Sequence, residues 1–293
     1  CLLRYFIINF MDINTKTFLY GIIGKPIGHS LSPYLHNYLF QYYKLNAVYL
    51  AFETDDVKNA IAGMKSLGIQ GFSVTIPNKV SVLEYLDELD ESVKIVGAVN
   101  TIKNNNNFLI GYNTDVFGVF KSFQIHNVDC NNKKIVIIGS GGACRAVISA
   151  LISNYKISEI KILGIKLDEI NDLLNLIKLF SNTYSSGYII NDISLKNSLF
   201  DADIIINTSP IGMSPKIDES PIPFDLLPDN KIVFDVVYNP IKTKLLQFAE
   251  QKKCKIISGL DMFKFQAQKQ FQIFSNIEPD IEIITNLLAS KIK

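Results

Sequence analysis

Runs of consecutive apolar residues alternate with stretches of helical periodicity through the second half of this chain. The runs are Ile135–Ile138, Ile160–Leu163, Ile204–Ile206, Ile232–Val237 and Lys255–Ile257. Continuous apolar runs are typical of strands that are buried on both faces of a parallel sheet. The helices between them are predicted at Ala143–Ile152, Asp168–Phe180 and Thr243–Gln251. Because parallel strands need crossover helices, this pattern predicts a doubly wound α/β domain.

The first third of the chain alternates in the same way, with shorter elements. Strands are predicted at Phe18–Ile23, Ala47–Phe52, Phe72–Ile76, Val99–Ile102 and Phe108–Gly111, and helices at Ser32–Tyr43, Val57–Leu67 and Val80–Leu89. The short Asn run at 104–107 is expected to form a loop or hairpin tip. Two final helices, Met262–Phe274 and Asp280–Lys291, are expected to pack back on this first part.

A length of 293 residues is enough for two domains. We expect one domain over residues 18–114, completed by about 262–293, and a second over 115–261. Met11 offers a natural start, so residues 1–10 are predicted to be an extension without a function.

Composition excludes several classes of protein. The formal net charge of +1 argues against a broad electrostatic surface for nucleic acid or an anionic membrane. No apolar run reaches the roughly 18 residues that a membrane span needs. The three His and four Cys are scattered, so we expect no metal site, no disulfide framework and a cytoplasmic location.

A glycine-rich turn lies between one predicted buried strand and the helix that follows it. It consists of Gly139, Ser140, Gly141, Gly142 and Ala143. Glycines here let the backbone approach a pyrophosphate, and the amides at the helix N-terminus attract its charge. Glycine turns also serve packing, but the context favours dinucleotide binding. About 20 residues on, Lys166 is suited to a 2′-phosphate and Asp168 to a ribose hydroxyl, although either side chain is equally explained as a solvated loop charge.

Three other strand-to-helix corners carry polar side chains. Ser30 and Ser32 suit an anionic or polyhydroxylated ligand, with helix capping by Ser32 as the alternative. Lys79 follows the turn at Pro77, and the alternative interpretation is an ordinary surface lysine. Asp115 begins a helix, where it is equally explained as an N-cap.

Asn100, in the predicted strand Val99–Ile102, is an unusual residue for a strand interior unless its amide is used. All of these corners lie at the carboxyl ends of strands, where open α/β sheets place their ligand crevice. A Lys and an Asp that meet there can serve as an acid/base pair for a carbonyl or an alcohol.

Taken together, these segments resemble the shikimate dehydrogenase family. The resemblance covers about residues 18–290, and eight motifs occur in the family's order: GKPIGHSLSP, GFSVTIPNK, GAVNTI, GYNTD, GSGGACRA, INTSPIGM, FDVVYNP and GLDMFKFQAQKQF. It implies an N-terminal α/β substrate domain, a Rossmann-type NADP domain and C-terminal helices that return to the first domain. The activity implied is reversible reduction of 3-dehydroshikimate to shikimate, a step toward chorismate and the aromatic amino acids.

The same resemblance assigns roles to residues. Lys79 and Asp115 become the catalytic pair. The implied substrate-binding residues are Ser30, Ser32, Thr75, Asn100, Asp115, Tyr238 and Gln266. The implied cofactor-binding residues are Gly139 to Ala143, Lys166, Val236, Gly259, Met262 and Glu91. Lys is a suitable acid if partial burial lowers its pKa, whereas Asp115 would favour the charged lysine.

Two departures from the family pattern leave alternatives open. Ser73 stands where the family usually has Asn. The family's basic NADP clamp is absent, because Gly164, Ile165 and Lys166 occupy that run and Glu169 falls near the later basic position. We expect NADP as the cofactor, with an NAD-preferring quinate/shikimate dehydrogenase as the alternative and a non-catalytic nucleotide-binding regulator as a third. The expected partner is a small-molecule substrate, and the chain is expected to be a monomer or a homodimer.

Overall fold

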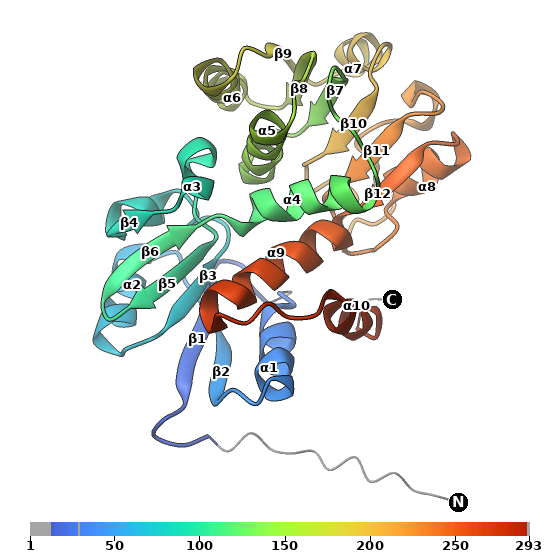
Figure 1. Ribbon diagram of the computed structural model, residues 1–293. Helices are drawn as coiled ribbons and strands as arrows, with labels where there is room; N and C mark the ends of the chain where they lie inside the picture. Colours follow the sequence, from blue (N-terminus) through green and yellow to red (C-terminus); the bar gives the residue numbers. More distant parts are fainter. Residues whose placement is uncertain (1–12, 29, 292–293) are drawn as a thin grey trace, which may run out of the picture.

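The computed structural model describes residues 13–28 and 30–291, so the predicted extension at residues 1–10 lies outside the described part. Within these ranges the strands form two six-stranded sheets. Two helices, α4 (Thr114–Ile125) and α9 (Gly259–Ser275), lie against each other and run between the sheets (Figure 1).

The first sheet has the strand order β2-β1-β3-β5-β6-β4. Its strands are β1 (Phe18–Gly24), β2 (Ala47–Glu53), β3 (Gly71–Val74), β4 (Glu88–Leu89), β5 (Thr101–Asn105) and β6 (Phe108–Tyr112). Strand β5 pairs antiparallel with both of its neighbours, and the other pairs are parallel. The helical elements of this part are α1 (Ser32–Tyr42), α2 (Val57–Ser66), the 3₁₀ helix η1 (Ser81–Tyr85) and α3 (Glu91–Val96). The expected hairpin tip is confirmed, since Asn106 and Asn107 adopt positive φ in the turn between β5 and β6.

The second sheet is parallel throughout, with the strand order β12-β11-β10-β7-β8-β9. Its strands are β7 (Lys134–Ile138), β8 (Glu159–Gly164), β9 (Tyr184–Ile189), β10 (Ile204–Asn207), β11 (Ile232–Asp235) and β12 (Lys255–Ser258). Its helical elements are α5 (Gly142–Asn154), α6 (Leu167–Phe180), α7 (Asp192–Leu199), the 3₁₀ helix η2 (Phe224–Leu226) and α8 (Lys244–Gln251). The predicted doubly wound fold is therefore confirmed.

Side chains on both faces of this parallel sheet are buried, as the apolar runs predict. On β7, Ile135 and Ile137 belong to one core cluster, whereas Val136 and Ile138 belong to a cluster on the other face. Strand β9 was not predicted. It lies at the edge of the sheet, where exposure permits a sequence with serines and a glycine in place of a continuous apolar run.

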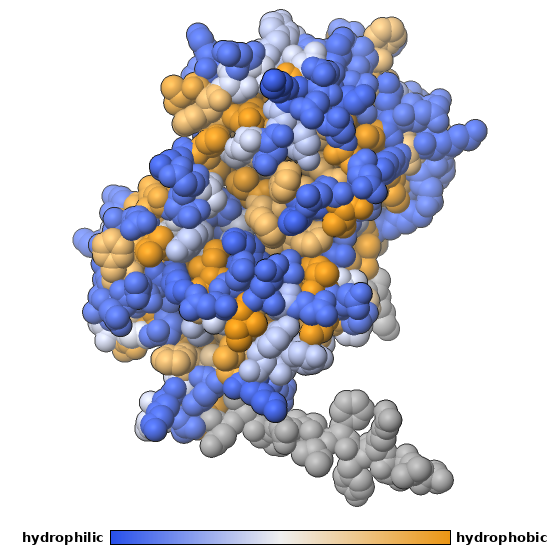
Figure 2. Space-filling view, in the orientation of Figure 1, coloured by the Kyte–Doolittle hydropathy of each residue, from blue (hydrophilic) through white to orange (hydrophobic). Residues whose placement is uncertain are grey.

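The C-terminal helices return to the first sheet, which confirms the expected packing. Phe271 and Phe274 of α9 and Ile284 of α10 (Ile281–Ala289) share a core cluster with Tyr20 of β1 and Tyr49 of β2. The face in Figure 2 is mostly hydrophilic, and its hydrophobic residues gather in patches, some of them over α4. Helices α4 and α9, which pack against each other, connect the two sheets.

The predicted helix at Val80–Leu89 is wrong. Only the short η1 forms, and the chain is extended again at Leu86, where ψ is 144°. The backbone N–H of Asp87 then donates to the carbonyl of Leu109, 3.0 Å away, and Glu88 and Leu89 pair with β6. Pairing with a strand 22 residues further along the chain outweighs the local helical periodicity. Helix α3, which was not predicted, follows directly.

Candidate active site

The site begins at the edge of the first sheet where β1 and β3 lie side by side while the next strand, β2, lies on the other side of β1. Ser30 and Ser32 follow β1, and Thr75 follows β3. This reversal of strand order is the place where open α/β sheets bind ligands. The fold therefore brings these three predicted residues to a suitable edge.

Ser32 is buried but does not cap helix α1. The N-cap is Leu31, with no side-chain capping bond, and Pro33 occupies the first turn. The backbone N–H of Ser32 donates to Oγ of Ser30 at 3.3 Å. Capping by Ser32 is therefore wrong as the alternative explanation, and its side chain instead interacts with the hydroxyl of Tyr49.

Lys79 and Asp115 meet at this edge. Lys79 Nζ donates to Asp115 Oδ2 at 2.6 Å, and both side chains are partly buried, with exposed fractions of 24% and 14%. The carbonyl of Lys79 accepts from the backbone N–H of Val99 at 2.8 Å, which ties the lysine's backbone to the loop before β5. The predicted pair is thus assembled from segments far apart in the sequence.

Asp115 is not the N-cap of α4, as the alternative explanation had it. That position belongs to Asn113, whose Oδ1 accepts from the backbone N–H groups of Asp115 and Val116. Nδ2 of Asn113 also donates to the carbonyl of Ala98 at 2.8 Å. Because Asn is as good a cap as Asp, the Asn-Thr-Asp sequence already contained this alternative. The carboxylate of Asp115 is left to hold Lys79.

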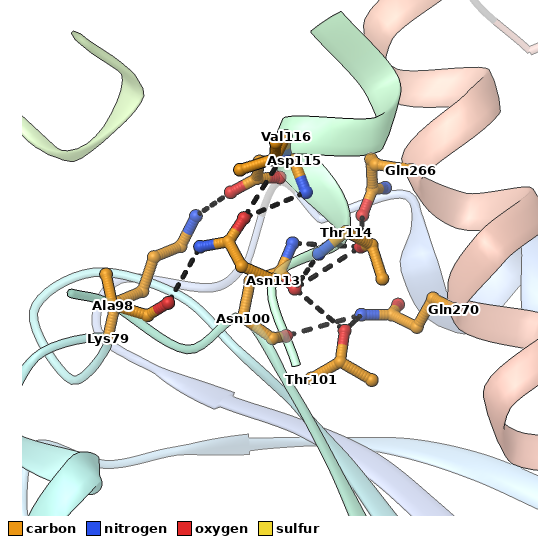
Figure 3. A network of polar contacts seen from close by, with 10 residues as sticks. All are labelled: Lys79, Ala98, Asn100, Thr101, Asn113, Thr114, Asp115, Val116, Gln266 and Gln270. Atoms are coloured by element: carbon orange, nitrogen blue, oxygen red, sulfur yellow. Dashed lines mark hydrogen bonds and ion pairs between the residues drawn. The ribbon is translucent and has the colours of Figure 1, made fainter. Parts of the chain in front are cut away.

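Asn100 lies just before β5, not inside it as the predicted strand Val99–Ile102 would have it, and its amide oxygen and one amide hydrogen bond to neighbouring residues (Figure 3). Its Oδ1 accepts from the backbone N–H of Thr114 and from Oγ1 of Thr101, both at 2.8 Å. Its Nδ2 donates to Thr114 Oγ1 at 3.0 Å. Thr114 Oγ1 also lies 3.3 Å from Oε1 of Gln266, which α9 brings to the same place. Thr101 and Thr114 were not predicted, although both lie beside predicted residues in the sequence.

The predicted residues of the 236–262 segment lie where β11 and β12 meet α9. Tyr238 stacks on Phe263 with ring centroids 4.7 Å apart, and burial raises its pKa. A Cβ at Gly259 would come within 2.2 Å of the carbonyl oxygen of Val236, so only glycine permits this approach. Met262 is buried one turn further along α9.

The glycine turn lies at the point where the second sheet changes strand order, between β7 and β10. Gly139 has a φ of +103°, and a Cβ there would come within 2.6 Å of Thr208 Oγ1. Helix α5 then begins at the N-cap Gly141 without a side-chain cap, so its first amides are open to a ligand. Ser140, Gly142 and Ala143 complete the turn. This geometry fits a pyrophosphate.

The end of β8 carries an ion pair directly beside that turn. Lys166 Nζ donates to Glu169 Oε1 at 2.8 Å, and Ser140 Oγ donates to Glu169 Oε2 at 2.7 Å. The Lys166 hydrogen bond, followed by that of Ser140, holds the pKa of Glu169 below its usual range. Asp168, the other candidate for a ribose hydroxyl, lies in the first turn of α6. The carboxylate that reaches the glycine turn is therefore Glu169.

Glu91 has its ion-pair partner outside the set of predicted site residues. Its carboxylate pairs with Lys94 on the same short helix, and its side chain is 81% exposed. In residues 13–28 and 30–291, no three His, Cys, Asp or Glu side chains gather as a metal site would require. No helix in those ranges is long and apolar enough to cross a bilayer.

Comparison with known proteins identifies the family. Residues 22–102 match the shikimate dehydrogenase substrate binding domain. The shikimate dehydrogenase (NADP(+)) of Methanococcus aeolicus is 40% identical over 280 residues, which is 94% of this chain and 98% of that protein. The chain belongs to the shikimate dehydrogenase family.

Solved structures of the family share the fold described above. A shikimate dehydrogenase in complex with NADP+ is 39% identical, with a TM-score of 0.87 over 96% of this chain and 98% of that one. The Listeria monocytogenes shikimate 5-dehydrogenase, in complex with shikimate and NAD, is 34% identical, with a TM-score of 0.86 over 94% and 98%. Family members have therefore been solved with both nicotinamide dinucleotides.

Proposed function

We propose that this protein is an NADP-dependent shikimate dehydrogenase that reversibly reduces 3-dehydroshikimate to shikimate. The observation that carries this proposal is the Lys79–Asp115 pair, partly buried at the ligand-binding edge of the first sheet. The curated relatives named shikimate dehydrogenase (NADP(+)) support it at about 40% identity over nearly the whole chain.

We assign residues 18–114, with about 262–293, to a substrate domain and residues 115–261 to a dinucleotide domain. This assignment is supported by the two sheets, whose strands fall within 18–112 and 134–258. In this assignment, the first sheet binds the substrate, the second sheet binds the cofactor, and the paired helices α4 and α9 connect the two.

Substrate recognition is assigned to uncharged side chains around the lysine. Ser30, Ser32, Thr75, Asn100, Tyr238 and Gln266 provide hydroxyl and amide groups. A ligand with several hydroxyls and one carboxylate needs both hydrogen-bond donors and acceptors, and these groups supply them. Asp115 adds a carboxylate that can accept from a substrate hydroxyl as well as from Lys79.

The residues of the second sheet fit a dinucleotide. The turn from Gly139 to Ala143 would hold the pyrophosphate, because its open amides and the missing side chains at its three glycines suit a close anionic group. Val236, Gly259 and Met262 would line the nicotinamide, and Lys166 would approach the 2′-phosphate. When bound, the nicotinamide supplies or accepts the hydride.

Lys79 is assigned the proton transfer that must accompany this hydride. Its ammonium has three hydrogens, of which Asp115 accepts one, so the others remain to be donated to the substrate oxygen. In the reduction Lys79 protonates the oxygen of the former ketone, and in the oxidation it takes that proton from the alcohol. Asp115 orients the ammonium through both halves of the cycle. Partial burial of the pair limits the competition from water.

An NAD-preferring quinate/shikimate dehydrogenase is the second candidate. The observation in its favour is Glu169, a carboxylate that reaches the glycine turn and neutralises Lys166. A non-catalytic regulator is disfavoured, because such a protein has no use for an assembled Lys79–Asp115 pair. We also propose a cytoplasmic location, given the scattered cysteines, and a monomeric or homodimeric state.

One assay separates these functions. Shikimate and quinate are each offered with NADP and with NAD, and formation of the reduced nicotinamide is followed by absorbance. Turnover of shikimate with NADP at the highest kcat/KM supports the proposal. Faster turnover with NAD would promote the second candidate, and no turnover in any combination would leave the regulator.

A further inference from the structure

Behind the predicted substrate residues, a chain of buried hydrogen bonds centres on Gln270 of α9 (Figure 3). Gln270 Nε2 donates to Thr101 Oγ1 at 2.8 Å and to the carbonyl of Asn100 at 3.3 Å. Gln270 Oε1 accepts from Ser73 Oγ at 2.7 Å and lies 3.0 Å from His36 Nε2. One side chain thus joins elements α1, β3 and β5 to α9.

The direction of each hydrogen bond toward Asn100 follows from the chemistry of the amide. Gln270 Nε2 can only donate, so Thr101 Oγ1 accepts from it and must direct its own hydrogen elsewhere. That hydrogen goes to Asn100 Oδ1, 2.8 Å away. Oδ1 also accepts from the backbone N–H of Thr114, which is an obligate donor. The oxygen of the Asn100 amide is therefore turned inward.

The nitrogen of the same amide is turned toward the site. One hydrogen of Asn100 Nδ2 is donated to Thr114 Oγ1. Its other hydrogen has no protein acceptor in the described ranges, so it is left for a ligand. The Thr101 hydroxyl is one of the groups that keep the Asn100 oxygen pointing inward. Without it, the amide of Asn100 would be held less firmly in this orientation.

At its other end, the chain of hydrogen bonds reaches Ser32, a second residue that was predicted to bind substrate. The hydroxyl of Tyr49 donates to Ser73 Oγ and also interacts with Ser32, and burial raises its pKa so that it stays protonated. Ser73 therefore accepts from Tyr49 and donates to Gln270. His36 stacks on Tyr49 with ring centroids 4.6 Å apart, and burial lowers its pKa to about 4, so the ring is neutral. Because Gln270 Oε1 can only accept, His36 Nε2 is the donor of the bond between them.

We propose that Gln270 is a positioning residue that, through Thr101, holds the amide of Asn100 with its N–H toward the substrate. Ser73, the residue that departs from the family pattern, belongs to the same chain because it fixes the orientation of the Gln270 amide. This proposal rests on the proposed function, since it concerns the affinity for shikimate. Neither Gln270 nor Thr101 touches the reacting atoms.

The test compares Gln270→Met, Thr101→Val and the double variant in the full-length chain. Met and Val retain most of the volume and remove the donor and the hydroxyl. We expect each single variant to raise the KM for shikimate about 5- to 20-fold, with the KM for NADP and kcat changed far less. Because both act on Asn100 along one path, the double variant should be no worse than the more severe single variant. Thr101→Ser, which keeps the hydroxyl, should restore the KM.

Two controls separate positioning from simple loss of stability. Phe271→Leu, in the core beside Gln270, should lower Tm without changing the KM for shikimate. If Gln270→Met lowers Tm and leaves this KM unchanged, the residue only satisfies buried groups and the proposal is overturned. Multiplicative effects of the two substitutions would overturn it too. If Gln270→Met does not fold, Thr101→Val against Thr101→Ser decides alone: equal KM values refute the path through Thr101.

A wrong proposed function would give a different result from a wrong positioning role of Gln270. In that case the unmodified protein would turn over shikimate with neither NADP nor NAD. A change in the KM of the variants is measurable only where the unmodified protein is active.

Discussion

Lys79 and Asp115 form a 2.6 Å ion pair although 35 residues separate them in the sequence. The pair exists because Asn113 takes over the capping of α4 and because the carbonyl of Lys79 is bound by the loop before β5. The backbones of Lys79 and Asp115 are therefore held in place by other residues, without using the side chains of the pair. The ammonium and the carboxylate remain free to meet a substrate.

We expect Lys79→Ala to lower kcat by roughly 10²- to 10⁴-fold, with a much smaller change in KM, because a general acid is lost. The matched control is Lys65→Ala, which removes a more exposed lysine paired with Asp87 at 3.1 Å. Exposed pairs contribute little, so this control should keep its activity. Steady-state kinetics of both variants measure the difference. Turnover of Lys79→Ala close to that of the unmodified protein would make Lys79 an ordinary surface lysine.

The double variant Ser30→Ala/Ser32→Ala is expected to weaken shikimate binding and to leave cofactor binding unchanged. A lost hydrogen bond to a buried partner typically costs about 1–3 kcal/mol. Calorimetric titration with shikimate and with NADP measures both affinities. Ser66→Ala, which removes a hydroxyl bonded only within α2, serves as the control. An equal loss for both ligands would point to misfolding.

We expect Lys166 and Glu169, which pair beside the glycine turn, to set the choice between NADP and NAD. We expect NADP to be preferred by a modest margin, roughly 5- to 30-fold in kcat/KM, because an exposed lysine contributes little to binding a phosphate. Lys166→Ala should shrink that margin with little effect on NAD. Glu169→Gln should widen it, because it removes a negative charge beside the 2′-phosphate and releases Lys166.

The control for these two variants is the exposed pair Lys216–Glu219, which has the same spacing. Lys216→Ala and Glu219→Gln should leave the ratio of NADP to NAD activity unchanged. A kcat/KM that favours NAD in the unmodified protein would refute the expected preference and support the second candidate.

Asp235 predicts a pH dependence of stability. Burial raises the pKa of its carboxyl to about 6, although the carboxylate accepts from Thr243 Oγ1, Asn207 Nδ2 and the N–H of Val237. Because the folded state binds this proton more tightly than the unfolded state, the contribution of Asp235 to stability falls as the pH rises from about 4 to about 6. Asp235→Asn has no charge to bury. Its stability relative to the unmodified protein should therefore rise over this interval, by about 1–2 kcal/mol.

Urea unfolding at several pH values measures this difference. Asp203→Asn, at the start of β10, provides a carboxylate control in the same part of the fold. A constant difference between Asp235→Asn and the unmodified protein across the interval would contradict the expected titration.

Gly118 predicts a stability loss at the helix pair that joins the two halves. A Cβ at this position would come within 2.6 Å of the carbonyl oxygen of Met262, so α4 and α9 would have to move apart. We expect Gly118→Ala to lower the free energy of unfolding by about 1–3 kcal/mol, despite the better helix propensity of alanine. Gly63→Ala in α2, where a Cβ meets no atom within 4 Å, should be neutral or stabilising. A stable Gly118→Ala variant would show that the two helices can separate at low cost.

Local patterns in the sequence were sufficient for much of the fold. The apolar runs of the second sheet predict its strands because parallel strands buried on both faces need apolar residues at every position. The glycines at 139–142 predict the turn because the backbone there requires a positive φ and close approach. The corner motifs placed Lys79 and Asp115 at the same edge because β3 and β6 run in the same direction on either side of β5, so their carboxyl ends lie at one edge of the sheet.

Contacts between distant residues decided the rest. The stretch at 80–89 has helical periodicity but pairs with β6, a partner that no local pattern reveals. Either Asn113 or Asp115 can cap a helix by its chemistry, and only the packing of α4 assigns that role to Asn113. In the sequence, nothing distinguishes Gln270 from the other polar residues of a C-terminal helix, and its role follows only from the packing of that helix on the first sheet. Its amide then meets Thr101 and Ser73, more than 160 residues away in the chain, because burial leaves each of these groups no solvent to bond with.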